Sequence, residues 1–522
     1  MVDALWRSGY CDRRAVVLGG LASLAASAAS VRAQGGDAPP PAALFGFEQV
    51  VEFARERAAS EYRNRKQSFS KRFEDLDYDG YRGIRHLPER RLWRDEGRGF
   101  SIDFTPPGLF YTEQVAINVV TSGEALPVPF DSSAFRYPEG WPELGEEDLK
   151  ADSGMGFSGF RVLFPLNRPD KADEVAVFQG ASYFRAVARG QNYGLSGRGL
   201  ALRTGEPEGE EFPSFTDFWL HQPQANATSL MIHALLDSPS VTGAYEFVLR
   251  PGAETVMETR MALFPRRDLK AVGIAPLTSM YYFGPKDRLG VDDFREAVHD
   301  SSGLQIVNGA GERIWRPLNN PARLQSSFFV DKAPQGYGLV QRKRRFELFQ
   351  DSEARYDKRP SCWVEPSGDW GAGGVKLVEI PTPNEFNDNI VAFWSPEANI
   401  DAGGRYDYTY RLIWSDQAPD AVQIARVVET RDGLSVNDEG VRHLIIDFEF
   451  PEEAPKGLQV QASTSAGTIS HVALYALPRE KSMRAAIDFV PPGEGATDMR
   501  VVLVDAAQEP ASETWLSRWD AP

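Results

Sequence analysis

Short strand-like runs, closely spaced and separated by turn residues, are the feature that most restricts how this chain can fold. Gly, Pro, Asn or Asp bounds such runs roughly every ten residues. Examples are GFRVLFPL, EVAVFQG, SYFRAVA, SLMIHALL, AYEFVLRPG and KLVEIP. The 46 glycines and 36 prolines would interrupt a bundle of helices, whereas they supply the turns that connect strands. The pattern therefore predicts an all-β protein.

One segment near the N-terminus departs from this pattern. LFGFEQVVEFARERAASEY (44–62) carries apolar residues three and four positions apart, which is the spacing of one helix face. They are Phe47, Val50, Val51, Ala54, Ala58 and Tyr62. We therefore expect one short amphipathic helix before the strands begin.

The end of the chain carries a separate series of strand-like runs. They are HLIIDFEF, GLQVQAST, TISHVALYALP, MRAAIDFVPP and DMRVVLVDAAQ. Their spacing is typical of a small immunoglobulin-like β-sandwich. A chain of 522 residues also exceeds one ordinary hydrophobic core. We predict a large β domain at 44–412 and an immunoglobulin-like domain at 420–522, connected at SDQAPD.

The N-terminus has the form of an export signal. Arg13 and Arg14 precede the apolar run AVVLGGLASLAASAAS, which ends at an A-x-A-like site before residue 34. Paired arginines before such a run indicate twin-arginine export; the alternative is a general signal in which they only supply charge. We predict a signal at 1–33 and a Gly/Pro-rich linker at 34–43. No later apolar run approaches the roughly 20 residues that span a bilayer, which predicts a soluble periplasmic protein without membrane insertion.

Charge and cysteine content exclude several classes of function. The formal net charge of −17 disfavours nucleic acid, because binding phosphates requires a basic face. Anionic lipid would be repelled as well, and a neutral ligand fits best. Of the two cysteines, Cys11 leaves with the signal, so Cys362 has no partner for an intramolecular disulfide. We expect Cys362 to be a buried thiol rather than a nucleophile.

Motifs for metals and cofactors are missing from the sequence. The six histidines are scattered, and no H-E-x-x-H or other ligand spacing occurs among them. Neither a G-x-S-x-G elbow nor a P-loop is present. We therefore expect neither a metal nor an organic cofactor, and acid–base chemistry by carboxylates remains.

The stretch 345–394 combines nine carboxylates with three tryptophans, a composition suited to a sugar polymer. Hydrolysis of a glycosidic bond needs one carboxylic acid and a second carboxylate. Two acids lie between turn residues and apolar strands, where burial raises a pKa: Asp300 in AVHDSSGLQI and Asp388 in NEFNDNIVAFW. The alternative for each is a turn or capping role.

Several segments resemble the periplasmic glucan biosynthesis proteins, the OpgG/OpgD family, also called MdoG/MdoD. They are YDGYRGIRH, QNYGLSGRGLALRT, FPSFTDFWL, HDSSGL with WRPLNNP, FQDSEARYDKRPSCWVEP and DNIVAFWSPE. The resemblance covers about residue 44 to the SETW at 512–515. The twin-arginine leader is similar to that of the OpgD branch. The implied fold is a galactose-mutarotase-like β-sandwich followed by an immunoglobulin-like β-sandwich.

The resemblance also implies a function. Members of the family make or shape osmoregulated periplasmic glucans, which are β-1,2-linked glucose chains, and OpgD-like members resemble inverting endo-β-1,2-glucanases. By this resemblance Asp388 is the general acid and Asp300 the general base. Inversion predicts carboxyl groups roughly 6.5–9.5 Å apart, and a wider gap requires water to relay the proton.

Further cleft residues are expected from the same segments. We expect a set of five to bind sugar or position the acids: Tyr356, Asp357, Arg359, Trp370 and Glu385. The alternative role for Arg359 is a purely structural ion pair with Asp357. For Trp363 and Trp394 a core position and a sugar platform are equally open.

Two other functions stay open at this point. One is a non-catalytic β-glucan-binding scaffold that assists a membrane glucosyltransferase. The other is a sugar epimerase or mutarotase, which the implied fold suggests only by analogy. The pair of aspartates favours a hydrolase over the scaffold, and the scattered histidines weigh against the epimerase.

Overall fold

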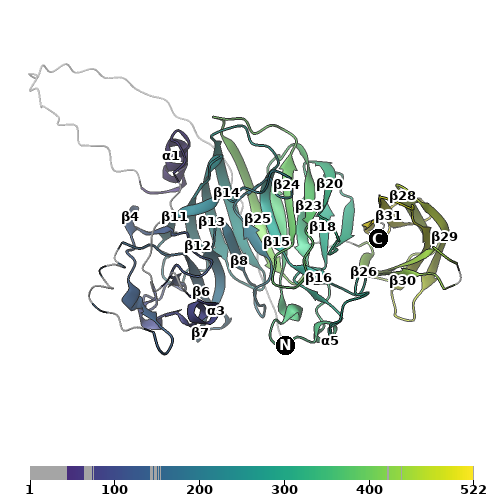
Figure 1. Cartoon of the computed structure of the whole chain (residues 1–522), viewed down its shortest axis with the longest axis horizontal. Helices are drawn as coiled ribbons and strands as arrows, with labels where there is room; N and C mark the ends of the chain where they lie inside the picture. The colour runs from purple at the N-terminus through teal and green to yellow at the C-terminus, as the bar shows by residue number, and fades with distance from the viewer. Residues whose placement is uncertain are drawn as a thin grey trace, which may run out of the picture. The chain divides into compact units, whose positions relative to one another are not determined.

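Two large β-sheets dominate the computed structural model of this chain (Figure 1). The structure describes residues 44–63, 73, 76–141, 145, 150, 152, 154–419, 423–436 and 438–520. The predicted signal at 1–33 and linker at 34–43 lie outside these residues. The described chain consists mainly of strands, which confirms the predicted all-β fold class.

The first sheet has ten strands. In spatial order they are β2 (Ser101–Thr105), β6 (Gly159–Arg168), β7 (Lys171–Gln179), β8 (Tyr183–Ala186), β9 (Ser196–Arg198), β15 (Val272–Ser279), β24 (Ile390–Pro396), β23 (Ala372–Glu379) and β20 (Gln325–Lys332), with β10 (Ala201–Leu202) paired to β15. Neighbours far apart in sequence meet in this sheet, because β15 pairs with β24 in antiparallel register. That pairing places the residues just before β24 beside the residues just after β15.

The second sheet has fourteen strands. In spatial order they are β28 (Gln459–Thr464), β31 (Ala496–Val504), β32 (Thr514–Asp520), β19 (Arg313–Pro317), β18 (Gly303–Val307), β21 (Gly336–Val340), β22 (Ser361–Ser367), β25 (Tyr406–Ser415), β14 (Thr255–Pro265), β13 (Val241–Arg250), β12 (Leu230–Asp237), β11 (Ser214–His221), β3 (Ala116–Thr121) and β4 (Glu124–Pro127). Two pairs in it, β3 with β11 and β19 with β32, are parallel.

Smaller elements complete the described chain. A four-stranded sheet contains β26 (Arg426–Leu434), β27 (Arg442–Glu449), β30 (Ser482–Val490) and β29 (Thr468–Ala476). Two-stranded ladders pair β1 (Arg85–His86) with β5 (Phe135–Arg136), and β16 (Tyr281–Phe283) with β17 (Val298–His299). The helices are α1 (Phe47–Ala58), α3 (Tyr78–Gly83), α5 (Phe346–Phe349), η1 (Pro88–Arg90), η2 (Ser132–Ala134) and η3 (Tyr356–Lys358). None of the helices within the described ranges is long and apolar enough to cross a bilayer.

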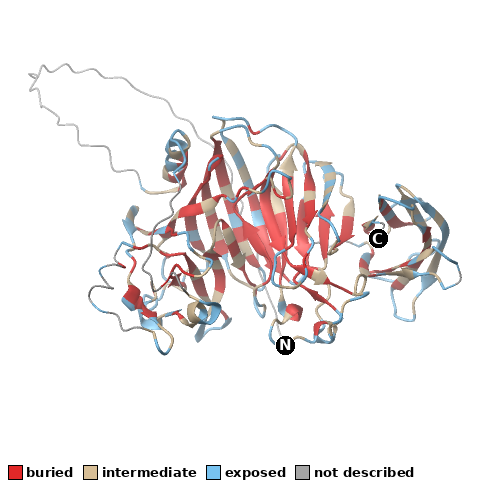
Figure 2. Ribbon diagram, viewed as in Figure 1, coloured by how far each residue is buried: buried red, intermediate tan, exposed pale blue. Residues whose placement is uncertain are grey.

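Aromatic side chains fill the core between the two large sheets, where Figure 2 shows the strands to be almost continuously buried. Trp394, Trp414 and Tyr245 are fully buried there. Each such ring stabilises the fold by about 1.5–3 kcal/mol through the apolar surface it removes from water. The hydroxyl of the buried Tyr337 lies 2.9 Å from the carbonyl of Ile274 and accepts from the Trp394 amide at 3.1 Å, so its polar atom has partners.

Helix α1 packs on the outer face of the fourteen-stranded sheet. Phe47, Val50, Val51 and Ala54 face β12, β13 and β14, and Thr242 donates to the Ala54 carbonyl at 2.6 Å. The predicted helix is therefore confirmed over Phe47–Ala58, although it ends before Tyr62. Because α1 covers this face, most residues of β12 to β14 are buried.

The C-terminal strands form a second core. The four-stranded sheet and β31 enclose buried side chains that include Phe448, Ile487 and Val501. All five runs predicted in this region are strands, β27 to β31. The fourteen-stranded sheet continues into this part through the parallel pairing of Trp315 with Trp515. The boundary at 412–420 stays a prediction, and β25 ends within it, at Ser415.

Candidate active site

The segment Met280–Tyr281 brings Asp300 and Asp388 to one place. Asp300 directly follows β17, and its amide donates to the Met280 carbonyl at 2.9 Å. Asn389, which directly follows Asp388, donates to the Tyr281 carbonyl at 3.0 Å and accepts from the Tyr281 amide at 2.8 Å. The two aspartates therefore flank the same dipeptide, although 87 residues separate them in sequence.

Asp300 is a buried carboxyl with one cation beside it. Its side chain is 8% exposed, and Nε of Arg359 lies 3.5 Å from its Oδ1. No described residue donates a hydrogen bond to that oxygen. Burial raises the pKa of Asp300; Arg359 opposes this and the charge of Asp388 adds to it. An oxygen left without a donor in such a place is ready to accept a proton.

Asp388 lies on the wall of a cavity of about 510 Å³. Its side chain is 31% exposed, and the guanidinium of Arg185 lies 3.4 Å from its Oδ2. Protein atoms surround this concave wall, and the resulting burial raises the pKa of Asp388, while Arg185 and Arg359 lower it. The cavity volume falls in the range of small-molecule sites.

Aromatic and cationic side chains line this cavity beside Asp388. They include Phe110, Tyr111, Tyr183, Arg185 and Tyr193, none of which the sequence analysis selected. The available signals were weak: Tyr193 lies in QNYGLSGRGLALRT, and Arg185 is the only charge in the apolar run SYFRAVA. The side chain of Arg185 is fixed by a bond from its Nε to Ser196 at 2.7 Å. Flat rings with a few fixed polar groups are the surface that a sugar ring needs.

Arg359 connects three of the sequence segments that carry the family resemblance. Its Nε donates to the Ala354 carbonyl at 3.1 Å, and its Nη1 donates to the Tyr193 carbonyl. A Cβ on Gly194 would lie 3.1 Å from Arg359, so the glycine leaves room for this side chain. Asp357 instead binds Arg355, through two hydrogen bonds of 2.9 Å. The alternative of an Arg359–Asp357 ion pair is therefore wrong.

Tyr356 and Glu385 lie in the electrostatic neighbourhood of Asp300. The Tyr356 ring is 3% exposed, and the Arg359 guanidinium lies 5.2 Å from its centroid. Burial raises the pKa of Tyr356, and Glu385 and Asp300 raise it further. Glu385 accepts a bond of 2.6 Å from Arg295. The structure therefore groups Tyr356, Arg359 and Glu385 around Asp300.

Trp370 lies apart from the aspartates. It is 5% exposed and packs in the main core against Trp394, Tyr408 and Tyr410, with Nε1 donating to the Thr409 carbonyl at 3.3 Å. The prediction that it lines the cleft is wrong, because three aromatic rings enclose the indole.

The other tryptophans and the cysteine of this region are buried as well. Trp363 and Trp394 are 4% and 0% exposed. Both are therefore core residues rather than sugar platforms. Cys362 is a free, fully buried thiol, as predicted. Burial raises its pKa well above the ordinary value, so the unreactive thiol form is favoured.

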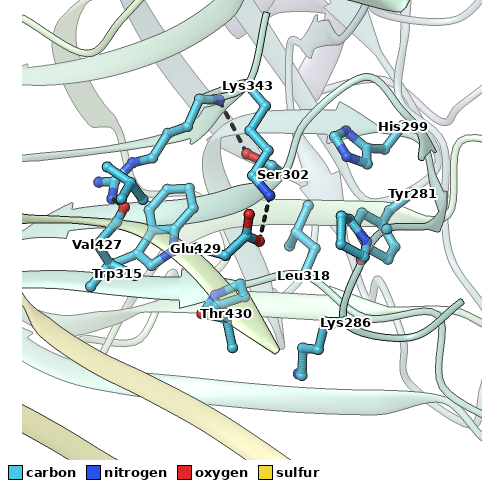
Figure 3. Close-up of a pocket in the computed structure, with 15 residues that line it drawn as sticks. Tyr281, Lys286, His299, Ser302, Trp315, Leu318, Lys343, Val427, Glu429 and Thr430 are labelled. Atoms are coloured by element: carbon cyan, nitrogen blue, oxygen red, sulfur yellow. Dashed lines mark hydrogen bonds and ion pairs between the residues drawn. The ribbon is translucent and has the colours of Figure 1, made fainter. Parts of the chain in front are cut away.

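A second cavity is lined by His299 and by residues of β16, β19 and β26 (Figure 3). Its volume is about 60 Å³, enough for a few water molecules but not for a sugar ring. The side chains in it are paired: Lys343 donates to Glu429 at 2.5 Å and Lys286 to Asn319 at 2.6 Å. Burial lowers the pKa of His299 to about 3, so this histidine stays neutral.

A metal centre is not formed by the residues that the structure describes. Among them, no three His, Cys, Asp or Glu side chains are grouped so that they could hold an ion.

Comparison with known proteins adds the family. The family described as "Periplasmic glucan biosynthesis protein, MdoG" matches residues 45–519. A protein of Bradyrhizobium diazoefficiens named "Glucans biosynthesis protein G" is 42% identical over 515 residues, covering 97% of this chain and 99% of its own length. Proteins of the same name from Rhodopseudomonas palustris strain BisA53 (44% identical, 92% of this chain and 95% of the relative) and Vibrio cholerae strain O395 (42%, 91% and 87%) are similar.

These matches cover nearly the whole chain, at identities that leave no doubt about common descent. The relatives named above carry the name of the G protein, and the assignment to the OpgD branch from the leader stays a prediction. The chain belongs to the periplasmic glucan biosynthesis protein family, MdoG.

Proposed function

We propose that this protein acts in periplasmic glucan biosynthesis as an inverting endo-β-1,2-glucanase. Family membership supports the biosynthetic role. The observation that carries the hydrolase is the pair of aspartates flanking Met280–Tyr281, both with raised pKa values and one on the wall of a sugar-sized cavity. A membrane glucan synthase as partner is a further proposal, which follows from the biosynthetic role alone.

Asp388 is the proposed general acid. Its raised pKa favours the protonated form, which a general acid must have before the bond breaks. Because its side chain is 31% exposed on the cavity wall, a glycosidic oxygen bound there can reach it. As the bond between C1 and this oxygen breaks, the proton of Asp388 passes to the oxygen of the leaving sugar.

Asp300 is the proposed general base. Arg359 lowers its pKa against the effect of burial and so favours the ionised carboxylate that a general base requires. Its side chain is 8% exposed, so we propose that ordered water, rather than direct contact, carries the proton to it. One water molecule attacks C1 from the face opposite the leaving oxygen, and its proton ends on Asp300. Such an attack inverts the anomeric configuration.

The test is incubation of the purified protein with linear β-1,2-glucan, followed by chain-length analysis. We expect shortening, and we expect Asp388→Asn and Asp300→Asn to slow it by about 10²–10⁴-fold, the usual contribution of a general acid or base. Asp170→Asn is the matched control, since the side chain of Asp170 is 70% exposed. Proton NMR of the first products should give the α-anomer; a β-anomer would contradict inversion.

A second function has one observation in its favour. The burial of Asp300 also suits a glucan-binding scaffold that assists a membrane glucosyltransferase, since a scaffold needs no accessible base. Binding of the glucan by folded wild-type protein without any shortening would support this scaffold and contradict the hydrolase.

A further inference from the structure

A third pocket, distinct from the cavity at His299, adjoins the Asp388 cavity. Its volume is about 220 Å³, and it shares Phe110, Tyr111, Arg161 and Gln179 with that cavity. A ligand chain bound at Asp388 can therefore extend into it without leaving the protein surface. We call it the arginine pocket, because Arg82, Arg85 and Arg161 line it.

Positive charge in the arginine pocket is only partly neutralised. Among the described residues Asp103 is the one carboxylate in its lining, and it already accepts a bond of 2.8 Å from Arg91. Arg161 lies 3.7 Å from Glu174. Arg85 forms no ion pair with any residue that the structure describes, and burial together with Arg161 and Arg82 lowers its pKa. This concentration of cations occurs in a chain whose net charge is −17.

Aromatic rings stand beside these arginines. Tyr81 and Tyr111 have ring centroids 5.6 Å apart and planes inclined by 33°. The Tyr81 hydroxyl donates to the Pro106 carbonyl at 2.9 Å and accepts from Gln179 at 2.7 Å, so the ring is fixed. Tyr78 and Phe110 are 63% and 84% exposed. Exposed and fixed rings next to cations fit a ligand that is part sugar and part anion.

We propose that the arginine pocket is a subsite for a sugar unit that carries a negatively charged substituent, such as a carboxylate or a phosphate ester. The sugar ring stacks on Tyr81 and Tyr111, and the substituent binds Arg82 and Arg85. This inference rests on the proposed glucan binding at Asp388 and deepens it, because it gives the protein a preference for anionic over neutral chains.

The test measures binding by calorimetry to the intact Asp388→Asn variant, in which hydrolysis does not interfere. The probes are neutral linear β-1,2-glucan, the same glucan esterified with succinic anhydride, and free succinate. We expect the succinylated glucan to bind about tenfold more tightly than the neutral one, as one charge-assisted pair predicts. The preference should weaken as salt is added. Free succinate, which lacks the sugar ring, should bind at least a hundredfold more weakly.

Combining Arg82→Gln and Arg85→Gln with Asp388→Asn tests whether these arginines cause the preference for succinylated over neutral glucan. The preference should fall below twofold, while the affinity for neutral glucan, which also reports correct folding, should change by less than twofold. Arg168→Gln is the matched control: Arg168 ends strand β6, which also carries Arg161, and its side chain is 65% exposed.

The outcomes separate this inference from the proposed function. Equal binding of the neutral and succinylated glucans, or a preference that survives the double arginine substitution, overturns the subsite and leaves the hydrolase intact. Failure of wild-type protein to shorten neutral glucan, with an arginine-dependent preference retained, overturns the hydrolase and leaves the subsite intact. If neither glucan binds, both are overturned.

Discussion

The small cavity at His299 and the large cavity at Asp388 differ in how their charged side chains are paired. In the small cavity next to β26, Lys343 and Glu429 form a close pair, and Arg342 binds Glu513 through bonds of 2.6 and 2.8 Å. For Asp388 in the large cavity and for nearby Asp300, the nearest partners among the described residues are single cations at 3.4 and 3.5 Å. Groups that satisfy one another hold two parts of the fold together. Groups left incompletely satisfied keep raised pKa values and remain available for a substrate.

The largest effect is expected at the small cavity. Glu513 is 1% exposed, so Arg342→Ala would leave a buried carboxylate without its cation. We expect this substitution to lower the free energy of unfolding by about 3–5 kcal/mol, measured by urea denaturation. Arg431→Ala is the control, since the side chain of Arg431 is 60% exposed. If Arg342→Ala lowers the free energy of unfolding no more than Arg431→Ala does, the ion pairs of the small cavity do not hold the fold together.

A smaller effect, on activity, is expected at the large cavity. Arg359 lowers the pKa of Asp300, so Arg359→Ala should raise that pKa further and reduce the ionised share of Asp300 that can accept a proton. We expect a loss of about 100-fold in glucan shortening at pH 7, near the lower limit for loss of a general base. The acidic limb of the pH–rate profile should move to higher pH, and Arg359→Lys should move it less. An unshifted limb would show that Arg359 does not act through Asp300.

The smallest effect is expected on stability, from removing the buried carboxyl group of Asp300. Burial raises the folded-state pKa of Asp300, so its contribution to stability is present at acidic pH and is lost as the pH rises through that pKa. Asp300→Asn should therefore stabilise the fold at pH 7 by about 1 kcal/mol, and the gain should shrink towards pH 4.5. Urea denaturation at both pH values measures it. A destabilised variant at pH 7 would mean that Arg359 already compensates the charge.

Local pattern was enough for some of these features. The spacing of Phe47, Val50, Val51 and Ala54 predicted α1, and the runs after residue 440 predicted β27 to β31. The sequence also predicted that Cys362, which has no second cysteine to pair with, is a buried thiol. Periodicity records which face of an element is apolar, and that information lies within a few residues.

The side chains around the aspartates were harder to predict. Sequence proximity suggested Asp357 as the partner of Arg359. In the structure Arg359 lies beside Asp300, and Asp357 pairs with Arg355. Trp370 was expected to line the cleft as a residue that binds sugar or positions the acids, but it is buried against Trp394. The partner of Arg359 and the burial of Trp370 both depend on contacts between distant segments, which neither propensity nor composition records.

The sequence by itself determined the all-β class, the helix before the strands and the family, and it singled out the two aspartates as candidates. Only the tertiary structure decided that Asp300 and Asp388 meet at Met280–Tyr281, that Asp388 faces a cavity, and that Arg82, Arg85 and Arg161 gather beside it. The physical reason is that strand identity follows from local apolar spacing, whereas the neighbours of a side chain follow from the order and register of strands such as β15 and β24.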